Sequence, residues 1–493
     1  MNTFHKKRLY ILLGAMALIW SSCVNEIWQE HYENSGSNLS TQSLTDLIDS
    51  RSDLSVFKTM LEKTGYDSIL NADQTYTVWA PSNSALSELD IASMDTMTLS
   101  EIVRNHIARF NYPTADFNSV STKKIYMQSG KFVPFDKNVS GFTFGTFTMD
   151  AANILARNGI LHVLNGIVPY ASNVWESLSR FTGSGGLDSV YAYLRPLGST
   201  PFGDINNEDS IYTAILPSNE AWIRAYDKIK PYFKCLPQAT RDSSLAKQRR
   251  LTQNAIMQDV FFRTNISDPG TVDSLFDTSN HKFLNASRLF AGATSHKASN
   301  GYIWISDSLR NTATESWHNE IRVEAENTSY GRTSSNANVY WRSGENTGFN
   351  VSGNRYIVAY PLTVSTLQKV WVSFAIPNTL SAKYRIYCQF APSAIQELVK
   401  LPGLVNIYLE YVKSDGTRYV SSNPFVIKAE VSSTAISKIF VTEMTFPYCN
   451  IVSNDSPGDI NVRVKVENAA LNTQSTIYTR TMLIDCIILE PVN

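Results

Sequence analysis

The sequence has no surplus of either charge, and this limits the partners that it can attract. Its 493 residues include 43 Lys and Arg against 44 Asp and Glu, a formal net charge of −1. Binding to many phosphates needs a basic surface, so we do not expect a nucleic-acid partner. Charged residues make up only 18% of the chain and hydrophobic residues 43%, which excludes a disordered protein. A chain of this length predicts about three folded domains.

Cysteine is also scarce, and the common catalytic motifs are absent. The five cysteines include no CxxC pair, so they form neither a disulfide framework nor a clustered metal site. Cys388 and Cys486 lie in apolar, strand-like runs, where buried free thiols are expected, and one bridge among the later cysteines stays open. HExxH, GxSxG and GxxxxGK[ST] do not occur. Enzymatic function is therefore not expected, although two distant carboxylates for glycoside hydrolysis remain an alternative.

One long apolar run, Leu9–Trp20, follows three basic residues near the N-terminus. This is the pattern of a secretory signal, predicted over residues 1–22. Twelve helical residues rise only about 18 Å, too little to span a bilayer core. The Ser-Ser-Cys end resembles a bacterial lipobox, which implies acylation of Cys23 and a polar tether over 23–38. An ordinary cleaved signal with an incidental cysteine is the alternative.

Two sequence patterns occur twice. Thr-Val-Trp-Ala-Pro-Ser-Asn at 77–83 parallels Thr-Ala-Ile-Leu-Pro-Ser-Asn at 213–219, and Asn-Gly-Ile-Leu-His-Val at 158–163 parallels Asn-Gly-Tyr-Ile-Trp-Ile at 300–305. Each pattern recurs roughly 140 residues later, so the repeated unit has the size of a domain. The β-branched and aromatic residues before Pro-Ser-Asn predict a buried strand, and Asn-Gly predicts a tight turn that leads into another.

These motifs, together with Asn105-His106, resemble the signatures of the fasciclin (FAS1) domain. The resemblance covers 39–171 and, more loosely, 172–311, where Asn254-Ala255 replaces Asn105-His106. It implies two α+β domains in which a β-wedge packs against helices. It also implies adhesion or surface interaction without catalysis.

Between the motifs, apolar residues from Leu99 to Phe110 follow helical spacing, and Thr98 and Glu101 suit a capping box. The pattern predicts one amphipathic helix. His106 lies on its apolar face, and His162 lies within a predicted strand. We interpret both histidines as hydrogen-bonded core residues and not as ligands.

The last third of the chain changes to short alternating strands. Arg310–Glu320 is polar and predicts a linker, and the period-2 segments after it predict an all-β jelly-roll sandwich over 316–493. The strand candidates are 371–376, 384–390, 405–412, 439–444, 460–466 and 482–489. The predicted fold class is therefore multidomain: two α+β fasciclin-like domains followed by a jelly roll.

Val-Glu-Ala-Glu-Asn at 323–327 resembles the start of galactose-binding-like carbohydrate-binding modules. Two further segments fit this resemblance, 370–390 as a central strand pair and 484–487 as the closing strand. The resemblance implies a structural calcium ion held by Glu324, Glu326 and Asp485, whose carboxylates are ligands that suit this ion. The alternative is that both glutamates occupy the solvated face of their strand.

Aromatic and basic residues are densest in a loop-like part of this domain. Glycan capture needs rings that cover the apolar faces of sugars and polar groups for the hydroxyls. The candidates are Tyr340, Trp341, Arg342, Arg355 and Tyr356. The alternative is packing of these aromatic residues in the core or at a sheet edge.

The sequence as a whole favours a non-catalytic surface lipoprotein. We expect a lipid anchor in the outer membrane, exposure at the cell surface and capture of an extracellular polysaccharide or host glycan for an uptake system. The alternative is a protein–protein adhesin or assembly factor that acts through the fasciclin domains.

Overall fold

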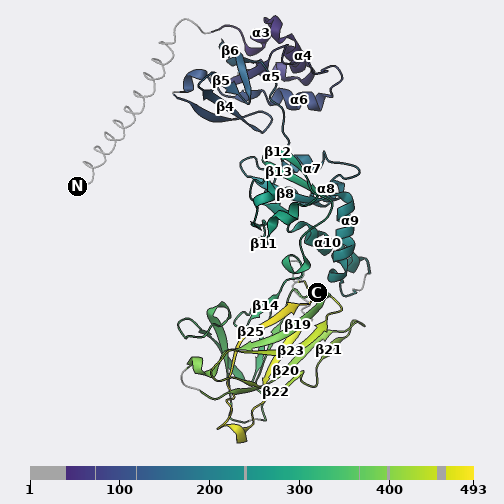
Figure 1. The fold of residues 1–493 in the computed structure, drawn as a ribbon, viewed down its shortest axis with the longest axis vertical. Coiled ribbons are helices and arrows are strands. Elements are labelled where there is room, and N and C mark those ends of the chain that lie inside the picture. The colour runs from purple at the N-terminus through teal and green to yellow at the C-terminus, as the bar shows by residue number, and fades with distance from the viewer. Residues whose placement is uncertain are drawn as a thin grey trace, which may run out of the picture. The chain divides into compact units, whose positions relative to one another are not determined.

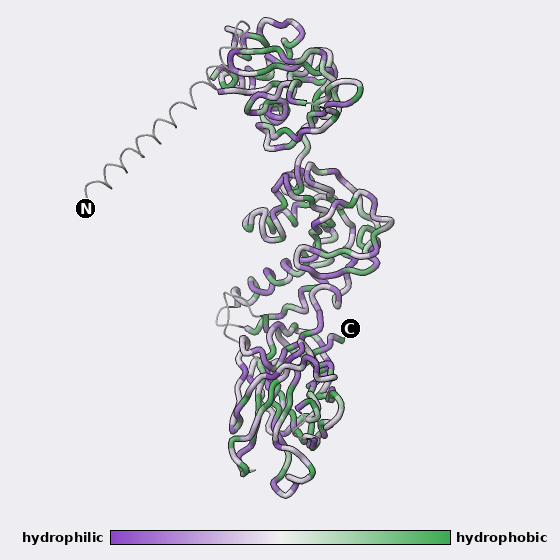
Figure 2. Tube along the Cα trace, turned by 90° about the vertical axis from the view of Figure 1, so that its left-hand side faces the viewer, coloured by the Kyte–Doolittle hydropathy of each residue, from purple (hydrophilic) through white to green (hydrophobic). Residues whose placement is uncertain are grey.

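The computed structural model describes residues 40–492 except 73, 118, 238–240, 366, 397–399 and 452–461. The chain divides into two compact units, one that ends at Ser172 and one that begins at Asn173 (Figure 1). The predicted signal 1–22, the lipidated Cys23 and the tether 23–38 lie outside the described residues. Of the helices that the structure describes, none is both long and apolar enough to cross a bilayer. Hydrophobic and hydrophilic residues interleave along the described chain (Figure 2).

The first unit holds one module, residues 40–172, built on a seven-stranded sheet. Its strand order is β2-β1-β7-β6-β5-β4-β3, and β1 and β7 pair in parallel. All residues of these two strands are buried, as continuous apolar runs in central parallel strands require. The strands are β1 (Tyr76–Pro81), β2 (Ile107–Arg109), β3 (Ser121–Tyr126), β4 (Phe132–Asn138), β5 (Gly141–Phe144), β6 (Phe147–Ala156) and β7 (Gly159–Leu164). The helices are α3 (Leu44–Asp49), α4 (Ser55–Thr64), α5 (Tyr66–Leu70) and α6 (Thr96–Arg104).

The helix predicted over 99–110 ends earlier in the structure than the apolar pattern indicates. Helix α6 ends at Arg104 and begins after the N-cap residue Asp95, whose carboxylate accepts hydrogen bonds from the backbone and hydroxyl of Thr98. The predicted capping box of Thr98 and Glu101 is therefore wrong. Ile107 already belongs to β2 and pairs with β1. Buried strand residues continued the helical spacing, and periodicity alone cannot separate these two cases.

Both histidines of this module are core residues, as predicted. The ring Nδ1 of His106 lies 2.8 Å from the carbonyl oxygen of Ile102, and its Nε2 accepts a hydrogen bond from Val168 N at 3.1 Å. The ring of His162 meets two backbone groups in the same manner. Burial lowers the pKa of each imidazole to about 4. Both rings are therefore neutral and structural at pH 7.

The second unit, which begins at Asn173, opens with a second module that has fewer strands. Its main sheet has the order β12-β13-β8-β9, with β8 and β13 parallel, and β10 and β11 form a separate hairpin. The strands are β8 (Tyr212–Pro217), β9 (Phe261–Phe262), β10 (Ser274–Phe276), β11 (Lys282–Leu284), β12 (Thr294–Ala298) and β13 (Gly301–Ser306). The helices are α7 (Val174–Leu178), α8 (Asp188–Leu194), α9 (Asn219–Ile229) and α10 (Arg241–Met257).

Each module contains a buried asparagine with the same set of hydrogen bonds, which we call the asparagine latch: Asn158 in the first module and Asn300 in the second. The side-chain oxygen of Asn158 accepts a hydrogen bond from Leu44 N at 2.9 Å, and its amide donates to two carbonyl groups at the end of α5. Asn300 accepts from Val174 N, also at 2.9 Å, and donates to two carbonyl groups before β8. The latch fastens the first helix of each module to its central parallel strands.

A glycine follows each latch residue because no side chain fits there. Gly159 has φ 155° and Gly301 has φ 141°. A Cβ atom at these positions would lie 1.9 Å from the carbonyl oxygen of Tyr76 and 1.8 Å from that of Tyr212. The repeated Asn-Gly thus encodes the same close strand approach twice.

After the second module the chain forms a β-sandwich in which every ladder between named strands is antiparallel. One sheet has the order β16-β17-β25-β19-β23, with β14 beside β25, and the other β15-β18-β24-β20-β21, with β22 beside β20. The predicted sandwich is confirmed. The strands are β14 (Ile321–Glu324), β15 (Thr333–Ser335), β16 (Ala337–Ser343), β17 (Arg355–Pro361), β18 (Trp371–Ala375), β19 (Lys383–Phe390), β20 (Gly403–Val412), β21 (Arg418–Val420), β22 (Val426–Val431), β23 (Ser437–Thr445), β24 (Arg463–Asn468) and β25 (Met482–Pro491).

Two details of the sandwich differ from the sequence predictions. The segment 370–390 is no strand pair, because β18 and β19 belong to different sheets. The segment 310–320 is no free linker either, since Trp317 and His318 are buried. Their rings lie 6.0 Å from Tyr232 and 4.9 Å from Tyr384, respectively. Burial of these large rings outweighs the polarity of their neighbours. The predicted limits at 171, 311 and 316 stay predictions.

Candidate functional site

Strand β16, at one edge of the sandwich, carries two of the predicted aromatic residues at its surface. The side chains of Tyr340 and Trp341 are 49% and 58% exposed. Each ring is accompanied by a guanidinium group: Arg342 lies 5.7 Å from the centre of the Tyr340 ring, and Arg355 lies 5.1 Å from that of Trp341. Such cation–π pairs hold exposed rings in place without covering them with other hydrophobic residues.

These four residues form two pairs on opposite faces of the strand, and not one cluster. Successive side chains of a strand point to opposite faces. Tyr340 therefore shares a face with Arg342, and its ring lies 6.2 Å from that of Tyr360. Trp341 shares the other face with Arg355, which is two positions from its cross-strand partner.

Tyr356 does not belong to this surface, which corrects the prediction from the sequence. It is only 2% exposed, and it packs with Val351, Val358 and Leu483 in a buried cluster. Burial raises the pKa of its hydroxyl. The position of the strand explains the burial, because β17 lies between β16 and β25, whereas β16 is the edge of the sheet.

The aromatic strand borders an open cleft of about 600 Å³. The cleft is lined by Glu326, Thr328 and Arg332 together with residues 339–343. Burial raises the pKa of Glu326, while the charges of Arg355 and Arg332 act in the opposite direction. Glu326 therefore lies near both guanidinium groups. Arg332 was missed by sequence reasoning, because a single arginine in a turn-rich segment carries no signal.

The three predicted metal-binding carboxylates converge next to this cleft. Ligand oxygens of Glu324 and Asp485 lie within 4.8 Å of one another, in a group that also includes Cys486. A Cβ atom on Gly353 would be 3.8 Å from both the Glu324 carboxyl carbon and a Glu326 oxygen. The structure therefore brings together residues that are far apart in sequence.

The hydrogen bonds at these carboxylates leave oxygen atoms without partners. Asp485 accepts hydrogen bonds from Ser352 N and, at 2.7 Å, from the side-chain amide of Gln389, and the Ser352 hydroxyl donates to Glu324 at 2.6 Å. One buried oxygen each of Glu324 and Glu326 has no hydrogen-bond partner among the described residues. Burial, with the charges of the two glutamates, raises the pKa of Asp485 to about 6.

This donor set fits a calcium ion. Glu324 and Glu326 each offer a buried oxygen without a hydrogen-bond partner among the described residues, Asp485 adds a third carboxylate, and carboxylate oxygens are the hard ligands that Ca²⁺ prefers. A cation would relieve the repulsion and desolvation that raise the pKa of Asp485. The alternative that both glutamates simply occupy a solvated face does not fit their buried oxygens.

A scan against family models matches one part of the chain. Residues 52–168 match the fasciclin domain. Mouse Stabilin-2 is 28% identical over 123 residues, which are 23% of this chain and 5% of that protein. Human Stabilin-1 is 26% identical over 136 residues, or 26% of this chain and 5% of that protein. The chain thus spans about a twentieth of the length of either relative.

Solved structures were also matched over parts of the chain. A FAS1 domain pair from the insect cell adhesion molecule Fasciclin I covers 53% of this chain and 98% of its own, with 13% identity and a TM-score of 0.23. The CBM22-1 xylan-binding domain from Paenibacillus barcinonensis covers 35% of this chain and 93% of its own, with 9% identity and a TM-score of 0.22. Because both TM-scores are low, the folds are assigned from the structure itself. The asparagine latch and the parallel pair β8 and β13 define the second module, and the strand order of the two sheets defines the sandwich. The predicted fold class, two fasciclin-like domains followed by a jelly roll, is confirmed.

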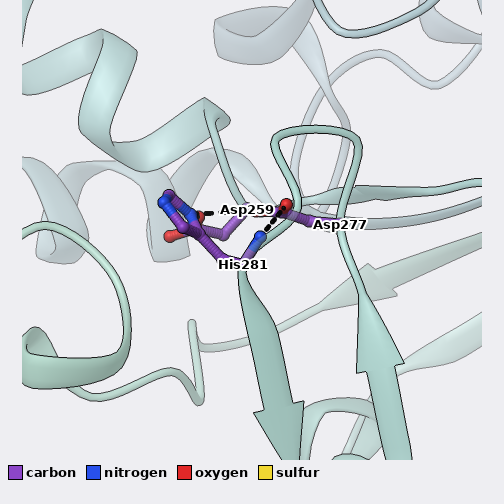
Figure 3. Close-up of side chains that lie close together, drawn as sticks. All are labelled: Asp259, Asp277 and His281. Carbon is purple, nitrogen blue, oxygen red and sulfur yellow. Dashed lines mark hydrogen bonds and ion pairs between the residues drawn. The ribbon is translucent and has the colours of Figure 1, made fainter. Parts of the chain in front are cut away.

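The second fasciclin-like module holds a charged cluster that sequence reasoning missed (Figure 3). The ring Nδ1 of His281 lies 2.8 Å from an oxygen of Asp259 and 3.2 Å from one of Asp277. Its hydrogen bond to Asp259 raises the pKa of His281, and burial raises that of Asp277 to about 6. Asp259 also accepts hydrogen bonds from Ser316 and Asn311.

This cluster has a structural role. It joins the end of α10, the β10–β11 hairpin and the segment that leads into the sandwich. The ring of His281 is hydrogen-bonded to Asp259 and ion-paired with Asp277, whose Oδ2 has no hydrogen-bond partner among the described residues. The three residues are scattered in sequence, and their spacing has no motif that could have revealed them.

Proposed function

We propose that this protein is a non-catalytic binding protein whose sandwich domain captures an extracellular glycan. The observation that carries the proposal is Trp341, an indole that is more than half exposed beside a charged cleft. Exposed aromatic rings that gather at a cleft, as Tyr340 and Trp341 do, are typical of a ligand-binding groove. Arg355 beneath it fixes the ring without hiding it.

The chemistry of the cleft suits a sugar. The apolar face of a pyranose ring packs on an indole, and charged side chains bind its hydroxyl groups. Glu326 supplies an acceptor, and Arg332 and Arg342 supply donors. Two guanidinium groups against one carboxylate favour a polysaccharide that carries uronic acids or other anionic groups.

The proposed calcium ion would have a structural part in this site. Glu326 is both a wall of the cleft and a member of the carboxylate group with Glu324 and Asp485. A bound cation would fix the 324–332 segment and, with it, the position of Arg332. The ion supplies charge and rigidity, while the sugar contacts come from the side chains.

The place of action is part of the proposal. The predicted signal and lipidated Cys23 support an outer-membrane anchor with cell-surface exposure, and the fasciclin module supports a role outside the cell. In this setting the protein would deliver a captured glycan to an uptake system.

Affinity gel electrophoresis of the full chain, purified in detergent, tests the binding function against neutral and anionic polysaccharides in parallel. We expect retardation by at least one anionic polysaccharide, and none when Trp341 is replaced by Ala. Absence of retardation by every polysaccharide would remove the glycan function. The variant Tyr356→Phe is the matched control, because that side chain is buried away from the cleft.

A second function, protein–protein adhesion through the fasciclin domains, is favoured by Phe110. This residue follows β2 with φ 71°, a conformation that bulky residues avoid, and its side chain is 70% exposed. A strained, exposed aromatic ring is suited to a protein partner. Cross-linking on intact cells that recovers one protein with the wild type, but not with Phe110→Asn, would support this function.

A further inference from the structure

We propose that Cys235 and Cys449 form a disulfide bond that fastens the second fasciclin-like module to the sandwich. The proposal rests on the exported location proposed above, because such bonds persist in oxidising compartments. Both cysteines are free thiols in the structure, and their Sγ atoms lie 3.8 Å apart. Rotation of two half-buried side chains can close this gap to a bond of about 2.05 Å.

The backbone holds the two cysteines side by side. Cys449 N donates a hydrogen bond to the carbonyl oxygen of Lys234, the residue before Cys235, at 2.8 Å. The ammonium group of Lys234 lies 5.1 Å from the ring centre of Tyr448. A second backbone hydrogen bond, Ser381 N to Tyr232 O at 2.8 Å, joins the same two domains. The sulfur atoms therefore meet at a built interface.

The other two described cysteines show what an unsuitable pair looks like. Cys388 and Cys486 lie on the neighbouring strands β19 and β25, but Cys388 pairs with Ile487 and Cys486 pairs with Gln389. The two thiols are thus one register position apart and point to opposite faces of the sheet. Burial raises the pKa of both, so neither forms a thiolate readily.

The electrostatics of Cys235 suit disulfide exchange. The hydrogen bond from Cys449 lowers the pKa of Cys235, and the positive charges of Lys247 and Arg250 act in the same direction. The same hydrogen bond raises the pKa of Cys449. Cys235 is therefore the attacking thiolate, and Cys449 the second thiol.

The oxidant would be a disulfide of an exported thiol oxidoreductase. The Cys235 thiolate attacks one sulfur of that disulfide, which forms a mixed disulfide and releases the other sulfur as a thiolate. Cys449 then loses its proton and attacks Cys235 Sγ, which displaces the oxidoreductase. Two electrons and two protons pass to the oxidant, which leaves as a dithiol.

The bond would lock an interface that is otherwise non-covalent. It joins positions 214 residues apart, so it removes many conformations from the unfolded chain. It also lies beside the packed rings of Tyr232, Trp317, His318 and Tyr384. The sandwich and the second module would then move as one body.

Peptide mapping tests the proposal. The full chain is extracted from its producing cells in the presence of N-ethylmaleimide, digested without reduction and analysed by mass spectrometry. We expect a peptide pair linked through Cys235 and Cys449, with Cys388 and Cys486 unlinked. Reduction should lower the melting temperature of the second unit by roughly 5–10 °C in the wild type and in Cys388→Ala, and by nothing in Cys235→Ser.

A second arm treats the purified, reduced chain with oxidised glutathione. If the pair stays unlinked in both arms, the proposed pairing is overturned. If it links with glutathione but is alkylated in cell extracts, the bond is absent from the cell, which overturns the proposal and counts against the exported location. Glycan retardation is measured on both redox forms, so that loss of the bond and loss of glycan binding remain distinguishable.

Discussion

Acid should destabilise the first fasciclin module through its two buried histidines. The fold holds His106 in one neutral tautomer: Nδ1–H faces the carbonyl oxygen of Ile102, and Nε2 accepts from Val168 N. If Nε2 took up a proton, it would become a donor that faces the N–H of Val168, and the hydrogen bond between them would break. The pKa of this buried ring is lowered from 6.5 to about 4.

The sign and size of the effect follow from this pKa. The unfolded chain binds a proton near pH 6.5, whereas the folded module resists it down to pH 4, so stability is complete above pH 6.5 and falls as the pH drops toward 4. Between pH 7 and pH 5 the loss is about 2 kcal/mol for His106. His162, whose pKa is also lowered to about 4, adds a similar loss. The pKa values of Asp46 and Asp95 are also lowered, but from a carboxyl value, so their contributions to the stability of the module are lost only at more acidic pH.

Hydrogen exchange of the β1 and β7 amides in the full chain measures this module alone. After correction for intrinsic exchange rates, the opening free energy should fall by roughly 3–4 kcal/mol from pH 7 to pH 5 in the wild type. It should fall by about half as much in His106→Gln, because glutamine can replace both hydrogen bonds without titrating. An opening free energy that is equal at the two pH values, or an equal fall in the variant, would refute the reasoning.

The other predictions concern the latch and the carboxylates. Asn158→Ala should destabilise only the first module and Asn300→Ala only the second. Each change should cost roughly 3 kcal/mol, since three hydrogen bonds of a buried side chain are lost. Hydrogen exchange measured separately for each module checks this, and an effect of either variant on both modules would contradict it. Calcium at about 1 mM should raise the melting temperature of the second unit at pH 7 by a few degrees, and EDTA should reverse the rise. Glu324→Gln should abolish this shift, whereas Glu345→Gln, a matched change elsewhere in the sandwich, should retain it; an identical shift in both variants would refute the site.

The fold was largely predictable because its determinants are local. Asn-Gly recurs where a tight approach of two strands excludes any side chain, and this requirement is the same in both modules. The alternation of apolar and polar residues likewise predicted the strands of the sandwich. The prediction of a helix over 99–110 was wrong because Ile107 is a buried residue of strand β2. A buried position is apolar in a helix and in a strand alike, so the sequence does not distinguish the two.

The site was only partly predictable because it depends on where each strand lies in its sheet. Trp341 and Tyr356 look alike in a list of aromatic residues, yet Trp341 lies on the edge strand β16 and is exposed, whereas Tyr356 lies on β17, between β16 and β25, and is buried. The convergence of Glu324 with Asp485 was expected only through a family resemblance. The contact of Cys235 with Cys449 depends on how two domains pack, and no local pattern encodes it.

The binding affinity of two variants tests the central claim most directly. For the anionic polysaccharide that retards the wild type most strongly, the dissociation constants of wild type, Trp341→Ala and Phe440→Ala are measured by calorimetry in calcium-containing buffer. Loss of a central aromatic contact costs about 2 kcal/mol, so Trp341→Ala should bind roughly 30-fold more weakly. Phe440→Ala removes a similarly exposed ring from β23, which does not line the cleft, and should stay within about threefold of the wild type. Unchanged affinity of Trp341→Ala would contradict a sugar site in this cleft.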